Sequence, residues 1–101
     1  MLPALSAVAR FKDGIRVHAN VLSLDLRGIT VRLLEPAPAS THTWIRFGLP
    51  DGSQSCMALG EVVEHNDDVL RLRFKHIFPD ARRALRRALA QSSATPQAQA
   101  A

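Results

Sequence analysis

The sequence predicts an all-β protein, namely a six-stranded antiparallel β-barrel followed by one C-terminal α-helix. Apolar and polar side chains alternate along six separate segments, which is the period of strands with one face in a core. Turn sequences rich in glycine, aspartate and asparagine separate most of these segments. After Phe78 the period becomes that of an amphipathic helix. With 101 residues, 47% of them hydrophobic, the chain has room for one packed domain.

The first three predicted strands cover residues 4–11, 15–23 and 28–34, and each alternates in hydropathy. Lys12-Asp13-Gly14 predicts a tight turn between the first two, because glycine tolerates the positive φ of hairpin turns. The polar segment Ser23–Gly28 connects the second strand to the third. These segments predict the first three strands of a barrel of up-and-down or Greek-key topology.

The second half of the predicted barrel begins after a looser connection at residues 35–41, whose prolines cannot donate to a strand ladder. Asp51-Gly52 and Asn66-Asp67-Asp68 predict two further tight turns, and Gly60 predicts a bulge or bend in a long strand. Three more alternating segments complete the barrel: residues 43–49, 54–65 and 69–76.

A helix is predicted from Pro79, which suits a first helical turn, and Asp80 favours its positive end. We expect it to end near Gln91, with residues 92–101 forming a disordered tail because they carry no charge and no large apolar residue. The chain is thus divided into one domain over residues 1–91 and a tail over 92–101. The apolar residues at helical spacing are Phe78, Ala81, Leu85, Ala88 and Leu89.

The sequence carries no signature of an enzyme or of a metal site. Cys56 is the only cysteine, which excludes an internal disulfide, and we expect it to be a buried structural thiol. No two histidines stand at metal-ligand spacing, and no glycine-rich phosphate loop of a common type occurs. We therefore expect a binding protein without catalytic residues, metal or cofactor. The four histidines, interpreted as surface residues, are His18, His42, His65 and His76.

The N-terminal sequence does not resemble a secretory signal, because Pro3 and Ser6 interrupt its apolar stretch and Arg10 ends it. No segment has the length needed to span a membrane. We expect a soluble cytoplasmic protein without membrane insertion.

One candidate binding site is the turn that contains Ser23, Asp25, Arg27 and Gly28. Its backbone amides and the Arg27 guanidinium could meet a phosphate or carboxylate of a ligand. Alternatively, Ser23 and Asp25 satisfy only the backbone of the turn itself, and Gly28 supplies an unusual φ. The residue types alone favour the second interpretation.

A second candidate surface lies on the predicted helix. The net charge is +4, and four of the thirteen basic residues form one strip on this helix. Such a strip could bind nucleic acid or an acidic partner, or could be a solvated face whose arginine stems cover the barrel. Against nucleic acid stands the shortage of stacking residues, since Trp44 is the one strand aromatic expected to be exposed. The strip consists of Arg82, Arg83, Arg86 and Arg87.

The order of these segments resembles that of a PilZ domain. The resemblance spans about residues 4–91 and lies in the succession of strand, short turn, strand, polar-x-polar-x-x-Gly turn and apolar strand, followed by three further strands and a helix. The matching segments are residues 4–11, 12–14, 15–22, 23–28, 29–33, 44–50, 59–63, 70–74 and 77–91.

PilZ domains are six-stranded barrels that commonly bind the bacterial second messenger cyclic di-GMP through two motifs. One is Arg-x-x-x-Arg before the first strand, and the other is Asp/Asn-x-Ser-x-x-Gly after the second. Here Ser23 stands where Asp or Asn is expected, Asp25 stands where Ser is expected, and Gly28 matches. The residues before the first predicted strand contain no Arg-x-x-x-Arg. The resemblance implies a divergent member of the family with weak or absent cyclic di-GMP binding.

Two function hypotheses from different classes follow. The first is an adaptor in cyclic di-GMP-related regulation of bacterial motility, pili or biofilm that acts by binding a protein partner. The second is a small basic barrel that binds RNA or DNA through arginines of the helix and strands. A homo-oligomer that buries a sheet edge or the face around Trp44 is a further possibility.

Overall fold

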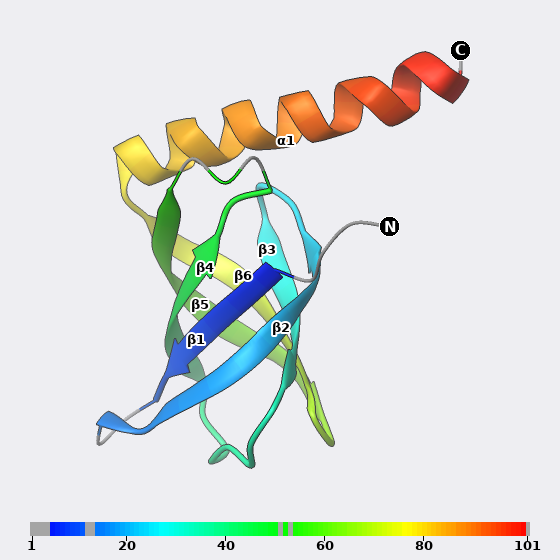
Figure 1. Ribbon diagram of the computed structural model, residues 1–101. Coiled ribbons are helices and arrows are strands. Elements are labelled where there is room, and N and C mark those ends of the chain that lie inside the picture. Colours follow the sequence, from blue (N-terminus) through cyan, green and yellow to red (C-terminus); the bar gives the residue numbers. More distant parts are fainter. Residues whose placement is uncertain (1–4, 12–13, 51, 53, 101) are drawn as a thin grey trace.

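The computed structural model describes residues 5–11, 14–50, 52 and 54–100, with side chains as far as Ala90. Every pair of neighbouring strands is antiparallel, and the strands close into a barrel in the order β1-β2-β3-β6-β5-β4 (Figure 1). The predicted fold class is confirmed, and each strand end lies within one residue of its predicted position. The strands are β1 (Leu5–Arg10), β2 (Arg16–Leu24), β3 (Gly28–Leu33), β4 (His42–Gly48), β5 (Ser55–Asn66) and β6 (Val69–Ile77).

The barrel interior is filled mainly by aliphatic side chains from all six strands. Ile45 and Val31 are fully buried, and the rings of Phe47 and Phe74 stack inside with their centroids 5.7 Å apart. Thr43 is the buried polar residue of this core, and its hydroxyl donates a hydrogen bond of 2.6 Å to the carbonyl of Arg10. The alternation read from the sequence therefore separates an apolar interior from a polar outer surface.

Three register shifts occur in the strands next to the candidate turn. The β5–β6 register shifts between Leu59 and Gly60, as predicted from the glycine, and again between Val62 and Glu64. The β2–β3 register shifts between Val21 and Ser23, which leaves the intervening Leu22 48% exposed. This shift changes which side of β2 faces the core, so that Ser23 enters the turn on the outer surface.

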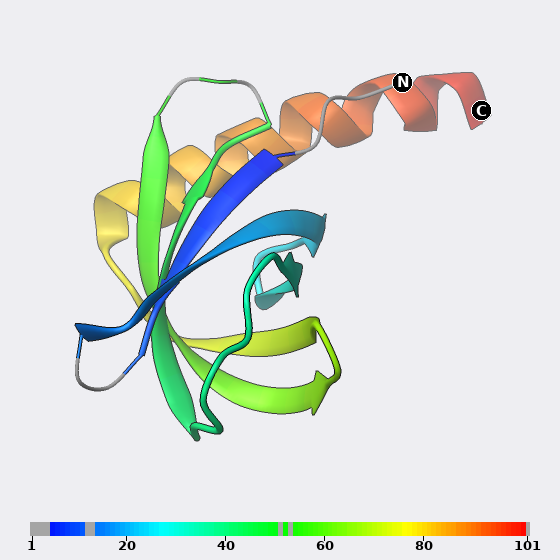
Figure 2. The ribbon, with the colours of Figure 1, turned by 60° about the horizontal axis from the view of Figure 1, so that its bottom comes forward.

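The helix α1 (Pro79–Ala100) lies across one end of the barrel (Figures 1 and 2). Ala81, Leu85 and Ala88 are buried against the strands, and the Sγ atom of the buried Cys56 in β5 lies 3.6 Å from the carbonyl oxygen of Ala81. The predicted helix start and the buried thiol are confirmed. These contacts come from the first three turns of the helix, which anchor it.

The predicted helix end near Gln91 was wrong. The helical backbone continues to Ala100 and includes Pro96, although proline disfavours a helix interior. The backbone of the expected disordered tail is therefore helical up to Ala100, whereas Ala101 lies outside the described residues. The division into a domain over residues 1–91 and a separate tail over 92–101 stays a prediction.

Candidate functional site

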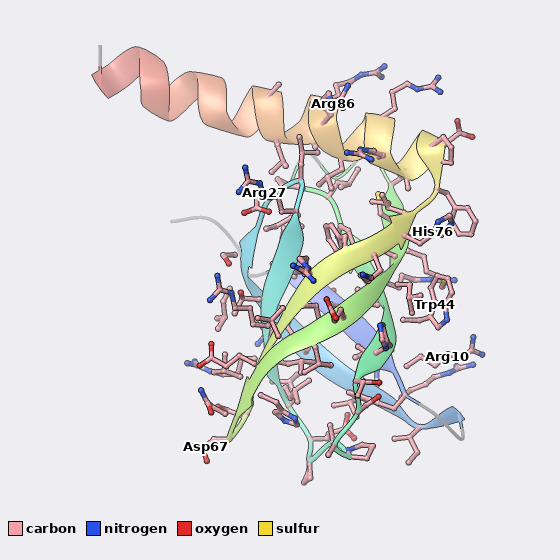
Figure 3. All side chains as sticks on the ribbon, turned by 180° about the vertical axis from the view of Figure 1, so that it is seen from behind. Arg10, Arg27, Trp44, Asp67, His76 and Arg86 are labelled. Carbon is pink, nitrogen blue, oxygen red and sulfur yellow. The ribbon has the colours of Figure 1, made fainter. Side chains whose placement is uncertain are left out.

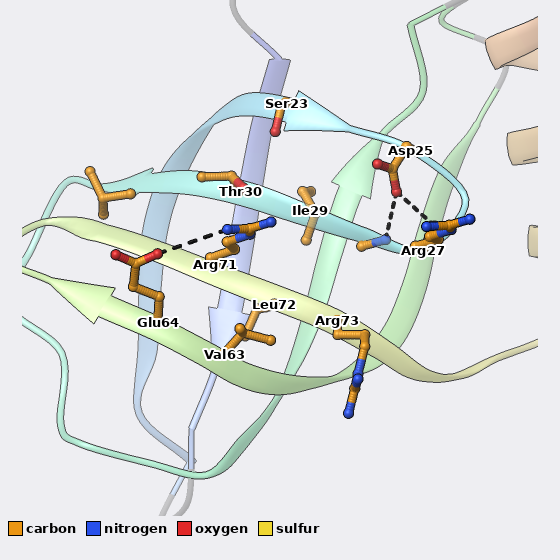
Figure 4. Close-up of a pocket in the computed structure, with 12 residues that line it drawn as sticks. Ser23, Asp25, Arg27, Ile29, Thr30, Val63, Glu64, Arg71, Leu72 and Arg73 are labelled. Carbon is orange, nitrogen blue, oxygen red and sulfur yellow. Dashed lines mark hydrogen bonds and ion pairs between the residues drawn. The ribbon is translucent and has the colours of Figure 1, made fainter.

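The turn between β2 and β3 is closed by its own aspartate. The Oδ1 atom of Asp25 accepts hydrogen bonds from the backbone amides of Arg27, at 2.7 Å, and Gly28, at 2.9 Å (Figure 4). The amide of Asp25 in turn donates to the carbonyl of Gly28 at 3.0 Å. Two amides that could donate to an anionic ligand are thus occupied. The interpretation that Asp25 hydrogen-bonds to the backbone of its own turn is confirmed.

Gly28 has a different role from the one expected. Its φ is not positive, so it supplies no unusual backbone conformation. A Cβ atom at this position would instead lie 2.1 Å from the carbonyl oxygen of Leu72 in β6. The glycine is therefore required by the close approach of β3 to β6, which the sequence around the turn does not reveal.

The turn forms one rim of a hollow of about 600 Å³ on the outer surface of the barrel. All four residues of the candidate binding turn contribute to its lining, and so do side chains of β5 and β6 that the sequence analysis did not connect with the turn. We call this hollow the turn pocket. Its lining residues are Ser23, Asp25, Arg27, Gly28, Ile29, Thr30, Val63, Glu64, Val69, Arg71, Leu72 and Arg73.

The β6 arginines of the turn pocket face carboxylates of the neighbouring strand β5. Arg73 donates a hydrogen bond to Glu61, and the Nη1 atom of Arg71 lies 4.0 Å from the Oε1 atom of Glu64. The hydrogen bond and charge of Arg73 lower the pKa of the Glu61 carboxyl below its ordinary value, so Glu61 is ionised at neutral pH. Two of the three pocket arginines are therefore balanced by carboxylates of the protein itself.

The sequence carried a partial signal for these additional residues. Arg71 and Arg73 alternate with apolar residues in the last predicted strand, which indicates that they point outward. Alternation does not tell which strand lies beside β3. The pairing of Gly28 with Arg73 and of Thr30 with Arg71 brings them to the turn.

The four helix arginines Arg82, Arg83, Arg86 and Arg87 are all exposed on α1, as Arg86 illustrates (Figure 3). The Nη2 atom of Arg83 lies 3.8 Å from Asp80 Oδ1 in a pair that is largely exposed on both sides. None of the four lines the turn pocket. Arg82 shares a smaller hollow of about 200 Å³ with Leu26 of the β2–β3 turn. The two candidate surfaces are thus separate.

Neither a metal centre nor a membrane-spanning helix is present among the residues that the structure describes. No three of their histidine, cysteine, aspartate and glutamate side chains come together as a metal site would require. None of the described helical segments combines the length and apolar character that a bilayer crossing demands.

The sequence model of the PilZ domain family matches residues 2–91, which include the whole barrel and the barrel-contacting turns of α1. No curated protein matches the chain. The match covers far more than half of the sequence, and the closed six-stranded barrel with its C-terminal helix agrees with it. The chain belongs to the PilZ domain family, whose members are binding and adaptor modules in cyclic di-GMP-related signalling.

Proposed function

We propose that this PilZ domain is an adaptor that binds a protein partner in bacterial regulation of motility, pili or biofilm, with weak or absent binding of cyclic di-GMP itself. The observation that carries the proposal is the closure of the β2–β3 turn by Asp25, which occupies the amides of Arg27 and Gly28. In this role the domain works in the cytoplasm without catalysing a reaction.

Charge in the turn pocket also supports weak nucleotide binding. A cyclic dinucleotide brings two phosphates, and arginine guanidinium groups are the side chains best suited to bind them. Arg71 and Arg73 already interact with Glu64 and Glu61, and Asp25 adds another carboxylate at the rim. An anionic ligand would have to displace these pairs and approach Asp25, whereas Arg27 alone offers an uncompensated charge.

Isothermal titration calorimetry with cyclic di-GMP tests the proposal. We expect the wild-type chain to bind with a Kd weaker than about 100 µM. The double variant Ser23→Asp/Asp25→Ser, which restores the turn pattern of the family, should bind at least about fivefold more tightly, because it removes a carboxylate from the position nearest the amides.

Arg32→Ala is the matched control, since Arg32 lies on β3 outside the turn pocket and pairs with Asp68 at 3.6 Å. It should leave the titration unchanged. Micromolar or tighter binding by the wild-type chain that disappears in Arg27→Ala or Asp25→Ala, but not in Arg32→Ala, would overturn the proposal.

The strip of Arg82, Arg83, Arg86 and Arg87 is retained as a proposed partner-binding surface. Its exposure supports this role, and the same exposure supports the alternative in which the strip binds RNA or DNA. A homo-oligomer through a free sheet edge has less support, because the described strands close into a barrel that leaves no edge unpaired.

A further inference from the structure

A second hollow lies on the other side of the barrel from the turn pocket, on the outer surface of β1, β2, β4 and β5. Its volume is about 220 Å³. Figure 3 shows Arg10 and Trp44 on this side, away from Arg27 of the turn. We call it the Trp44 pocket. It is lined by Val8, Arg10, Arg16, Trp44, Arg46 and Met57.

Strand pairing holds these side chains in two adjacent rows. Arg10 of β1 stands directly opposite Arg16 of β2 on one side and Trp44 of β4 on the other. In the next row, Arg46 of β4 stands opposite Val8 of β1 and Met57 of β5. Because four paired strands carry the pocket, its three guanidinium groups and its aromatic ring are positioned without a mobile loop.

Among the residues that the structure describes, no carboxylate balances the charges of this pocket. Within the described part of the chain, Arg10, Arg16 and Arg46 form no ion pair and no side-chain hydrogen bond, and no carboxylate lines the pocket. Like charges directly opposite each other in an antiparallel ladder are destabilising. The Arg10–Arg16 pair therefore costs stability in the free protein, and an anionic ligand would relieve that cost.

The residue types indicate which ligand fits. Guanidinium groups bind carboxylates in bidentate geometry, and the half-buried Trp44 with Met57 offers an apolar surface beside them. Tryptophan, methionine and arginine are the residues enriched at protein–protein interfaces, and tryptophan and arginine dominate their binding energy. A volume of about 220 Å³ lies below the range of about 300–1,000 Å³ for small-molecule pockets and suits a few side chains of a larger partner.

Two other occupants fit less well. Proteins bind single-stranded nucleic acid by stacking successive bases on several aromatic rings, and this pocket contains one aromatic ring. A second copy docked through the same surface would place its own Arg10, Arg16 and Arg46 against these three, because a two-fold interface pairs identical patches. Charge complementarity favours an acidic partner.

We propose that the Trp44 pocket is the docking site for an acidic segment of a partner protein, in which carboxylates flank a bulky apolar or aromatic side chain. The carboxylates pair with Arg10, Arg16 and Arg46, and the apolar side chain packs on Trp44 and Met57. This inference rests on the proposed adaptor role and adds a docking surface for it that is distinct from the strip of helix arginines. Titration with cyclic di-GMP is assigned to the turn pocket by the Arg27→Ala and Asp25→Ala variants, whereas the docking site is tested by variants of Arg10, Arg16 and Arg46, so the two proposals can fail separately.

A displayed random peptide library provides the first test. The full chain is used as bait. Peptides selected on the wild type are compared with those selected on the triple variant Arg10→Gln/Arg16→Gln/Arg46→Gln, so that peptides whose binding depends on the Trp44 pocket are identified. Peptides that prefer the wild type should carry at least two acidic residues next to an aromatic or large aliphatic one. No enrichment over the triple variant, or enrichment of peptides without acidic residues, would overturn the assignment.

Trp44 is the only tryptophan of the chain, so its fluorescence reports directly on occupancy of this pocket. Addition of the most enriched peptide, synthesised without tryptophan, should shift Trp44 emission in the wild type. The triple variant should bind at least about tenfold more weakly, because each lost charge-assisted hydrogen bond is a strong one.

The matched control Arg32→Gln/Arg71→Gln/Arg73→Gln has the same loss of charge at three strand arginines that each face a carboxylate, and should bind within about twofold of the wild type. An equal loss in this control would show binding by net charge and contradict the proposal. Binding of a short oligo-dT that is as tight as the peptide and equally lost in the triple variant would assign the pocket to nucleic acid instead.

Discussion

Two faces of one barrel carry three arginines each, and the two sets of arginines differ in whether carboxylates pair with them. On the turn pocket, Arg71 and Arg73 face Glu64 and Glu61, and Asp25 closes the adjoining turn. On the Trp44 pocket, no carboxylate among the described residues approaches the three arginines. The number of basic residues therefore says little about where an anion binds, since compensation by neighbouring carboxylates decides how much charge is available.

The two faces also differ in their relation to the family's usual ligand site. The turn that gives most PilZ domains their nucleotide contacts is here satisfied internally. The uncompensated face lies on strands that the family's two nucleotide motifs do not include. A domain built in this way can keep the fold and the signalling context while its binding surface moves to another side of the barrel.

The largest expected effect concerns the backbone that builds the turn pocket. Gly28→Ala should lower the free energy of unfolding by about 3 kcal/mol or more, because the new Cβ would lie 2.1 Å from the Leu72 carbonyl and β3 would have to move away from β6. Gly48→Ala is the control, since no atom lies within 4 Å of its Cβ position, and it should change stability by about 0.5 kcal/mol or less. Denaturant unfolding measures both, and equal effects would contradict the close approach of the two strands.

A smaller effect should have opposite signs on the two faces. Arg16→Gln removes a like-charged cross-strand pair with Arg10 and should raise stability by about 0.5 kcal/mol at low salt. Arg73→Gln removes the partner of Glu61 and should lower the melting temperature. Added salt should reduce both changes, because it screens exposed charges. Thermal unfolding at two ionic strengths measures this, and destabilisation by both variants would mean that the faces do not differ in compensation.

The smallest effect is a pH dependence of stability, which we expect from the Glu61–Arg73 pair beside the turn pocket and not from the Arg10–Arg16 pair of the Trp44 pocket. The pKa of Glu61 is lowered in the folded protein, chiefly by the hydrogen bond from Arg73, so the unfolded chain takes up its proton first as the pH falls. The stabilisation by Glu61 is therefore fully present above its ordinary pKa of 4.5 and is lost as the pH falls through the lowered value.

The melting temperature of Glu61→Gln should accordingly lie below that of the wild type at neutral pH and approach it in acid. The difference between the wild type and Arg16→Gln should show no such convergence in this range, because none of the carboxylates that the structure describes pairs with Arg16. Scanning calorimetry across this range tests both, and a pH-independent difference for Glu61→Gln would contradict the ion pair.

Much of the candidate turn was predictable from its residues alone. An aspartate side chain in a turn readily accepts hydrogen bonds from amides two or three residues further on, and Asp25 does this in the structure. The role of Gly28 was not predictable in this way, because the atom that excludes a side chain belongs to Leu72, far along the sequence. The helix end was also missed, because a charge-free segment that contains Pro96 and no large apolar residue favours a disordered tail over a helix.

The sequence by itself determined the number of strands, their ends within one residue, the start of the helix and the hydrogen bonding of Asp25 to the amides of its own turn. These features follow from periods and hydrogen bonds that span a few residues. The tertiary structure alone decided which side chains from distant strands share a pocket, such as Trp44 with Arg10 and Arg73 with the β2–β3 turn. Barrel closure pairs β1 with β4 and β3 with β6, strands distant in the chain, and a strand's alternation is identical whichever neighbour it acquires. The contrast between the turn pocket and the Trp44 pocket therefore comes from strand pairing.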